Sequence, residues 1–231
     1  MKSYLLSLLI LASAAAVSAA DLSGKVTLDG TPPPEKTVDL AGPFAVCSAS
    51  HPGGLTTRHY IVGADKGLAN VFVYVKTGAP KSAPAGEGPV LDQKGCLYEP
   101  YVLGVQAGQE FTIKNSDSFM HNIHALPQAN DGFNFAQPLA NMKTKKKFDK
   151  PEVLVKFQCD VHPWMFAYVG VVDNPYFAVT DKDGKFTIKN LPPGTYTIEA
   201  VHPKAGRKSQ EIKVTDSAKP LDFTLSVPSA K

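Results

Sequence analysis

Apolar and polar residues along the chain recur at the spacing of β-strands. Short runs rich in valine, isoleucine, threonine and aromatic residues lie between glycine- and proline-rich turns, and no long stretch repeats its apolar residues at a helical period. The clearest candidate strands are residues 24–29, 70–76, 153–158 and 166–172. Short strands separated by such turns are typical of sandwiches and barrels. The pattern therefore predicts an all-β fold.

The first 20 residues do not follow this pattern. The stretch "MKSYLLSLLILASAAAVSAA" has one lysine, an apolar run too short to span a bilayer, and small residues before Asp21. These features predict a secretory signal peptide cleaved after Ala19 or Ala20. No second long apolar run follows and no cysteine lies at the cleavage site, so we expect neither a membrane span nor a lipid anchor. We expect the protein to be periplasmic or secreted.

The remaining chain of roughly 210 residues is long enough for one large β domain or two small ones. The formal net charge of the whole sequence is +3. A balance this close to neutral gives no general attraction to nucleic acid.

Three cysteines follow the predicted leader: Cys47, Cys96 and Cys159. In an oxidising compartment an odd count leaves one thiol unpaired. Cys47 lies in a loop-like stretch, and Cys96 has no histidine at a metal-like spacing. We expect these two to form a disulfide, although sequence alone leaves the other pairings open. Cys159 is then free.

The segment around the free cysteine carries the candidate chemistry. In "VKFQCDVHPWM", between two predicted strands, Cys159 is followed by His162 and Met165. One cysteine, two histidines and a weak methionine are the ligands of a blue-copper centre. The second histidine must come from upstream, where "FMHNIHALP" offers His121 and His124. Taken singly, a cysteine, a histidine or a methionine on an apolar segment is more often a core residue than a metal ligand. Zinc is the weaker metal hypothesis, because methionine is a poor zinc ligand.

Two segments, "VQAGQEFTIKNSDSFMHNI" and "FQCDVHPWM", resemble the cupredoxins, most closely amicyanins and plastocyanins. The resemblance covers about residues 90–172 and implies a Greek-key β-sandwich or barrel with one type 1 copper. In that family the upstream ligand directly precedes an asparagine. The resemblance therefore implies His121, Cys159, His162 and Met165 as ligands and places His124 at the surface or behind the ligands.

The resemblance also implies how the ligands are supported. Asn122 is expected to bond across to the residue after the cysteine, because such bonds orient metal ligands. That residue is Asp160, where relatives usually carry serine or threonine, and its carboxylate is expected to accept the bond and to add negative charge beside the sulfur. Trp164 and its neighbours are expected to form an apolar surface around an exposed edge of His162, with packing of Trp164 into the core as the alternative.

A second resemblance concerns the rest of the chain. The segments "DKDGKFTI" and "LPPGTYTIEA" are similar to the second half of carboxypeptidase regulatory-like, or transthyretin-like, domains, whose first-half features appear far upstream in "LSGKVTLDGTPPPEKTV" and "KGLANVFVYVKTG". This predicts a cupredoxin at 90–172 inserted into a sandwich built from 22–80 and 173–228. Insertion at an exposed loop is structurally cheap, and the proline-rich segment 77–89 would be the entry linker. Two tandem domains are the alternative.

Taken together, these features predict an electron carrier rather than an enzyme. No hydrolase motif or phosphate-binding loop is present, and a copper ion held by four protein ligands has no open position for a substrate. The expected partners are redox proteins such as a c-type cytochrome or a dehydrogenase. The lysine-rich segment 143–150 could dock an acidic partner or be a solvated hairpin. The alternatives are a non-redox copper carrier and a structural interaction module.

Overall fold

The structure is a computed structural model that describes residues 19–215 and 219–229. All but the last two residues of the predicted signal peptide lie outside this range. No helix in the described part of the chain is long and apolar enough to cross a bilayer. The described residues contain short helical turns and many strands, which confirms the predicted all-β fold.

The elements in chain order are β1 (Ala20–Asp29), η1 (Gly42–Phe44), α1 (Ala45–Ser48), η2 (Ala64–Lys66), β2 (Phe72–Thr77), β3 (Val90–Gln93), β4 (Tyr98–Glu99), β5 (Val102–Gln106), β6 (Phe111–Asn115), β7 (His121–Leu126), β8 (Phe133–Gln137), β9 (Lys143–Lys146), β10 (Glu152–Gln158), β11 (Phe166–Val172), β12 (Phe177–Val179), β13 (Lys185–Leu191), β14 (Gly194–His202), β15 (Gly206–Val214) and β16 (Phe223–Ser226).

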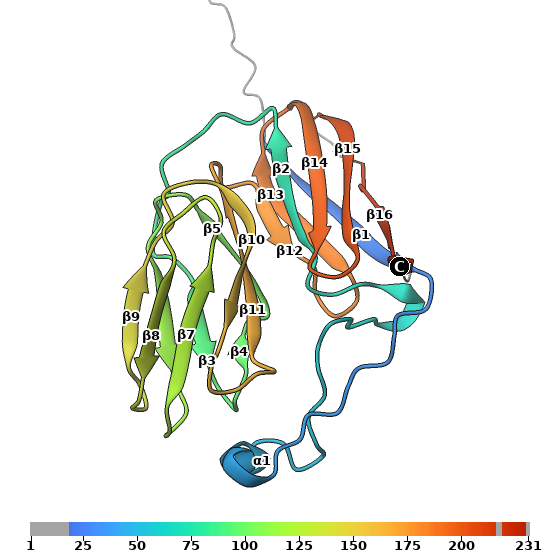
Figure 1. Ribbon diagram of the computed structural model, residues 1–231. Helices are drawn as coiled ribbons and strands as arrows, with labels where there is room; N and C mark the ends of the chain where they lie inside the picture. Colours follow the sequence, from blue (N-terminus) through green and yellow to red (C-terminus); the bar gives the residue numbers. More distant parts are fainter. Residues whose placement is uncertain (1–18, 216–218, 230–231) are drawn as a thin grey trace, which may run out of the picture.

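Strands from both ends of the described chain form one sandwich, called here the terminal sandwich (Figure 1). One sheet has the order β13-β1-β16 and the other has the order β12-β2-β14-β15. Apolar side chains from both sheets, among them Val26, Val73, Ile198 and Phe223, share one buried core. The chain leaves this sandwich after β2 and returns to it at β12.

The strands β3 to β11 form a second sandwich, called here the central sandwich (Figure 1). Its sheets have the orders β4-β3-β6-β9 and β5-β11-β10-β7-β8. Their inner faces share a core that includes Leu91, Ile113 and Phe157. Buried and half-buried residues alternate along most of β7, as expected where one face of a strand meets the core.

The two sandwiches meet through close contact between aromatic rings and glycines. Gly104 of β5 and Gly170 of β11 lie opposite each other in a parallel pair. A Cβ atom at Gly170 would lie 2.5 Å from the ring of Phe72, and one at Gly104 would lie 2.4 Å from the ring of Phe177. Glycine is therefore required at both positions for β2 and β12 to approach the central sandwich this closely.

Between β1 and β2 the chain extends away from the terminal sandwich and returns (Figure 1). We call residues 35–57 the strap. Its two legs are joined by backbone hydrogen bonds, including Val38 N–H to Leu55 O at 2.8 Å, and its far end carries η1 and α1. A disulfide between Cys47 of α1 and Cys96 of the β3–β4 turn ties the strap to the central sandwich.

Candidate metal centre

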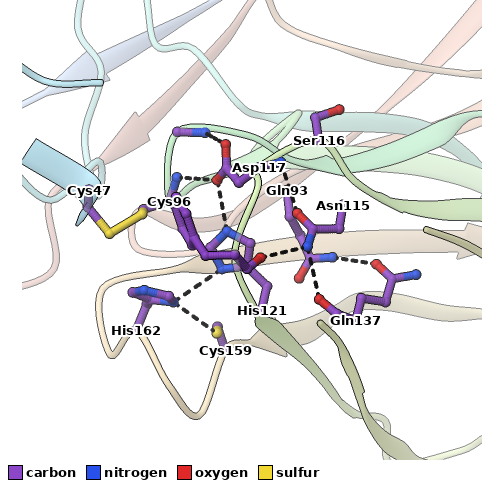
Figure 2. Close-up of polar contacts among 12 residues, drawn as sticks. Cys47, Gln93, Cys96, Asn115, Ser116, Asp117, His121, Gln137, Cys159 and His162 are labelled. Carbon is purple, nitrogen blue, oxygen red and sulfur yellow. Dashed lines mark hydrogen bonds and ion pairs between the residues drawn. A yellow bond between two sulfur atoms is a disulfide. The ribbon is translucent and has the colours of Figure 1, made fainter. Parts of the chain in front are cut away.

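Two imidazoles and one thiol meet at one end of the central sandwich, where β7 begins and where the loop between β10 and β11 turns (Figure 2). The Nδ1 atoms of His121 and His162 are 3.1 Å apart, and the Sγ atom of Cys159 is 3.5 Å from Nδ1 of His162. The exposed fractions of His121, Cys159 and His162 are 0%, 2% and 3%. The structure thus brings three of the four predicted ligands into one buried cluster.

The spacing of these atoms suits a metal ion. Metal–nitrogen bonds of about 2.0–2.1 Å and metal–sulfur bonds of about 2.3 Å, at angles of about 110–120°, separate neighbouring donors by roughly 3.3–3.7 Å. The observed separations of 3.1 and 3.5 Å lie close to this range. A soft thiolate combined with imidazoles is a donor set that copper accepts. The residues present therefore fit a copper ion.

Met165, the fourth predicted ligand, belongs to the same buried core as Cys159. The Cys159 N–H donates to the Met165 carbonyl at 3.2 Å, and the Met165 N–H donates to the His162 carbonyl at 2.9 Å. These two bonds fold residues 159–165 into a compact loop. The loop therefore carries three of the predicted ligands within a single turn of chain.

His124 lies on the other face of β7. Successive side chains of a strand point to opposite faces, so two histidines three positions apart cannot both face the core. The His124 side chain is 30% exposed, and its Nδ1 atom lies 3.0 Å from a carboxylate oxygen of Asp160. His124 is therefore outside the cluster.

The bond between Asn122 and Asp160 runs in the opposite direction from the one expected. The backbone N–H of Asp160 donates to Oδ1 of Asn122 at 3.0 Å, so the Asp160 carboxylate does not accept from the asparagine. That carboxylate instead accepts from Gln158 and Asn134 and faces His124. Its charge therefore points outward toward a histidine and away from the sulfur.

Asn122 also contacts the thiol through its backbone. Its N–H points at the Cys159 Sγ atom at a distance of 3.3 Å. Tyr98, which is fully buried, donates from its hydroxyl to the Asn122 carbonyl at 2.6 Å. The same hydroxyl lies 3.3 Å from the Gln158 carbonyl, so the start of β7 and the end of β10 are tied together on both sides of the cysteine.

Sequence reasoning missed Asp117, which holds His121 in place (Figure 2). The Nε2–H of His121 donates to Oδ2 of Asp117 at 2.8 Å. The same carboxylate accepts from the N–H groups of Cys96, at 2.9 Å, and Gly95, at 2.7 Å. Because the Nε2–H bond to Asp117 fixes the orientation of the ring, the Nδ1 atom of His121 faces the cluster. The stretch Asn115-Ser116-Asp117 lies within the segment that resembles the cupredoxins, but no role for this aspartate was predicted from it.

A network of buried amides supports the turn that carries Asp117 (Figure 2). Gln93, Asn115 and Gln137 are each fully buried. Gln93 donates to the side-chain oxygen of Gln137 at 2.7 Å, and Asn115 donates to the Gln137 carbonyl at 2.9 Å. The Asp117 N–H donates to the Asn115 side chain at 2.9 Å. Buried polar groups joined in this way make the local backbone rigid.

The electrostatics of the cluster favour a thiolate. Burial raises the pKa of Cys159, but hydrogen bonds from the two imidazoles and from the Asn122 N–H outweigh burial and lower this pKa to about 6. Burial lowers the pKa of His121, and the Asp117 carboxylate and the thiolate together raise it above its usual value. Metal ligands bind as thiolate and neutral imidazole, so the protein environment already favours the ionised sulfur.

The expected exposed edge of His162 is absent from the structure. The His162 ring lies under Trp164, with 5.4 Å between centroids, and beside Phe44 of the strap, at 6.0 Å. Trp164 is half-buried, and its Nε1–H donates to the Cys96 carbonyl at 3.0 Å. The expectation failed because the strap, whose position depends on contacts far apart in the sequence, covers this end of the sandwich.

Comparison with known families identifies one part of the chain. Residues 163–226 match the carboxypeptidase regulatory-like domain family, which covers less than a third of the 231 residues. The match confirms the resemblance predicted for the C-terminal segment. No curated protein sequence matches the chain.

Three solved structures are similar to part of the chain. A copper-containing nitrite reductase from Thermus scotoductus shares 21% identity at a TM-score of 0.35, over 44% of this chain and 25% of its own. A purple cupredoxin from Nitrosopumilus maritimus shares 25% identity at a TM-score of 0.31, over 37% of this chain and 99% of its own. An amicyanin variant shares 19% identity at a TM-score of 0.33, over 43% of this chain and 97% of its own.

This chain therefore spans only a quarter of the length of the nitrite reductase.

Proposed function

We propose that the protein is an exported electron carrier that holds one type 1 copper ion. The observation that supports this most strongly is the convergence of the His121 and His162 Nδ1 atoms and the Cys159 Sγ atom in one buried cluster. Met165, in the adjoining core, is proposed as the weak fourth ligand that distinguishes a blue-copper donor set from a zinc site.

The chain holds the donors in fixed positions. Asp117 holds the His121 ring by its Nε2–H, and the Asn122–Asp160 bond joins the two ligand-bearing segments. Burial keeps water from the donor atoms. A copper ion bound there would accept one electron and release it again. Donors that hardly move between the two oxidation states keep the reorganisation energy small, which favours fast transfer.

The same arrangement argues for a carrier that is not an enzyme. Four donors from the protein leave no position for a substrate at the metal. The proposed partners are exported redox proteins, such as a c-type cytochrome or a dehydrogenase. Exposed Lys143 and Lys145 on the edge strand β9 support docking of an acidic partner, because complementary charge raises the encounter rate.

A metal and redox titration with paired histidine variants tests the proposal. The wild-type protein should bind one copper ion and take up and release one electron reversibly with ascorbate and ferricyanide. His121→Ala and Cys159→Ser should lose this behaviour, whereas His124→Ala, which removes a histidine from the outer face of the same strand, should keep it. Preference for zinc over copper, or copper that does not cycle between oxidation states, would contradict an electron carrier and favour a structural or storage site.

A further inference from the structure

The imidazole of His162 is covered by a part of the chain that does not belong to the central sandwich. Phe44 comes from η1 at the far end of the strap, and its ring packs edge-on against Trp164 with a centroid distance of 4.9 Å. Trp164 in turn lies over His162. The strap, through Phe44, is therefore one part of the cover that leaves His162 3% exposed.

The Cys47–Cys96 disulfide is the covalent attachment of this cover. Its sulfur atoms lie within 4.8 Å of a ring nitrogen of His162. The Cys96 sulfur also lies within 4.8 Å of an Asp117 carboxylate oxygen and of a His121 ring nitrogen. Figure 2 shows the bond directly beside the two histidines. The disulfide is thus a direct neighbour of the candidate metal cluster.

Little else holds the far end of the strap. The elements η1 and α1 have three and four residues, too few to form stable helices alone. Cys47 is the only buried residue in either element. Phe44 and Leu40 pack against the central sandwich. Near the same end, His51 Nε2 lies 2.6 Å from the Gly95 carbonyl oxygen. The covalent bond therefore carries much of the attachment.

We propose that the Cys47–Cys96 disulfide is a reducible latch that keeps the strap over His162. A dithiol reductant would break the Sγ–Sγ bond and form two thiols, supplying two electrons and two protons while it becomes a disulfide itself. Released at Cys47, the strap moves away with Phe44 and exposes the His162 edge. Reduction of this disulfide therefore controls access to His162. The consequence for electron transfer rests on the proposed function, whereas the opening of the strap does not.

Chemical modification of the metal-free protein tests the latch without reference to copper. The full mature chain is incubated with or without dithiothreitol, then with diethyl pyrocarbonate, and the modified histidines are located by mass spectrometry. Alkylation of Cys47 and Cys96 verifies reduction. We expect His162 to react at least tenfold faster after reduction, and amide hydrogen exchange in residues 38–55 to accelerate in parallel.

Two histidines serve as internal controls. His124, which is already partly exposed, should react at the same rate in both states. His202, buried in the terminal sandwich at 2% exposure, should stay protected. Reactivity of His202 after reduction would mean global unfolding and would overturn a local latch, as would unchanged reactivity of His162 in fully reduced protein.

A variant with the disulfide intact separates the cover from the latch. Phe44→Ala should raise the reactivity of His162 without accelerating exchange in residues 38–55. An unreactive His162 in this variant would show that Phe44 is not the cover and would contradict the mechanism.

Discussion

Replacing Asp117 by asparagine tests whether this carboxylate positions a ligand. Asp117 accepts three hydrogen bonds, from the His121 ring and from the N–H groups of Cys96 and Gly95. Asparagine has the same shape but only one acceptor atom. Whichever way the amide is oriented, at least one backbone N–H loses its acceptor. The His121 ring loses its anionic partner in both orientations.

The magnitude follows from these lost bonds. Leaving a buried donor unsatisfied costs about 1–3 kcal/mol of stability, and Asp117 has a side chain only 11% exposed. Loss of the group that orients a ligating histidine typically weakens metal binding about 10- to 100-fold, which corresponds to roughly 1.4–2.7 kcal/mol. We therefore expect Asp117→Asn to lower both the stability of the metal-free protein and its affinity for copper.

Competition with a chelator of known affinity measures the copper affinity, and denaturant unfolding measures the stability. Asp160→Asn is the matched control, since it removes the same charge from a carboxylate that faces outward to His124. It should change copper affinity less than threefold. If Asp117→Asn binds copper as tightly as the wild type, or if Asp160→Asn weakens binding equally, Asp117 does not position His121.

Three further predictions concern the thiol, the bridge and the glycine contact. The thiolate absorbance of the metal-free protein at 240 nm should titrate with a midpoint near pH 6, and Cys159→Ser should lose this step. The pKa of Cys159 in the folded protein lies below the unfolded value of about 8.5. The stabilisation from the thiolate is therefore complete above about pH 8.5 and declines as the pH falls toward 6. Asn122→Ala should lower the free energy of unfolding by about 0.5–1.5 kcal/mol, because the Asp160 N–H loses its acceptor. An unchanged denaturant midpoint would contradict this bridge. Gly170→Ala should cost about 1–3 kcal/mol through the clash at Phe72, whereas Gly53→Ala, in open space, should change stability by less than about 0.5 kcal/mol.

Part of the metal centre could be read from strand periodicity alone. His121 has the parity of buried Ile123 and Ala125, whereas His124 has the parity of half-buried Asn122. Cys159 likewise continues the inward positions of Val155 and Phe157. Because strand side chains alternate, such patterns determine which face a residue takes, and the all-β architecture follows from the same signal.

Other features depend on contacts that no local pattern records. Asp117 lies in a polar turn four residues before His121, and its bonds to the Gly95 and Cys96 N–H groups appear only when this turn and the β3–β4 turn are placed together. Phe44 reaches His162 through the path of the strap, and the direction of the Asn122–Asp160 bond depends on backbone geometry at the end of β10. Long-range placement decides the first two features, and backbone geometry decides the third.

The most direct test of the central claim is the visible and electron paramagnetic resonance spectrum of the mature protein loaded with Cu(II). We expect an intense blue thiolate-to-copper band and a narrow copper hyperfine splitting, both lost in Cys159→Ser. A colourless protein, or an ordinary tetragonal copper spectrum that survives in Cys159→Ser, would contradict a type 1 copper centre at His121, Cys159, His162 and Met165.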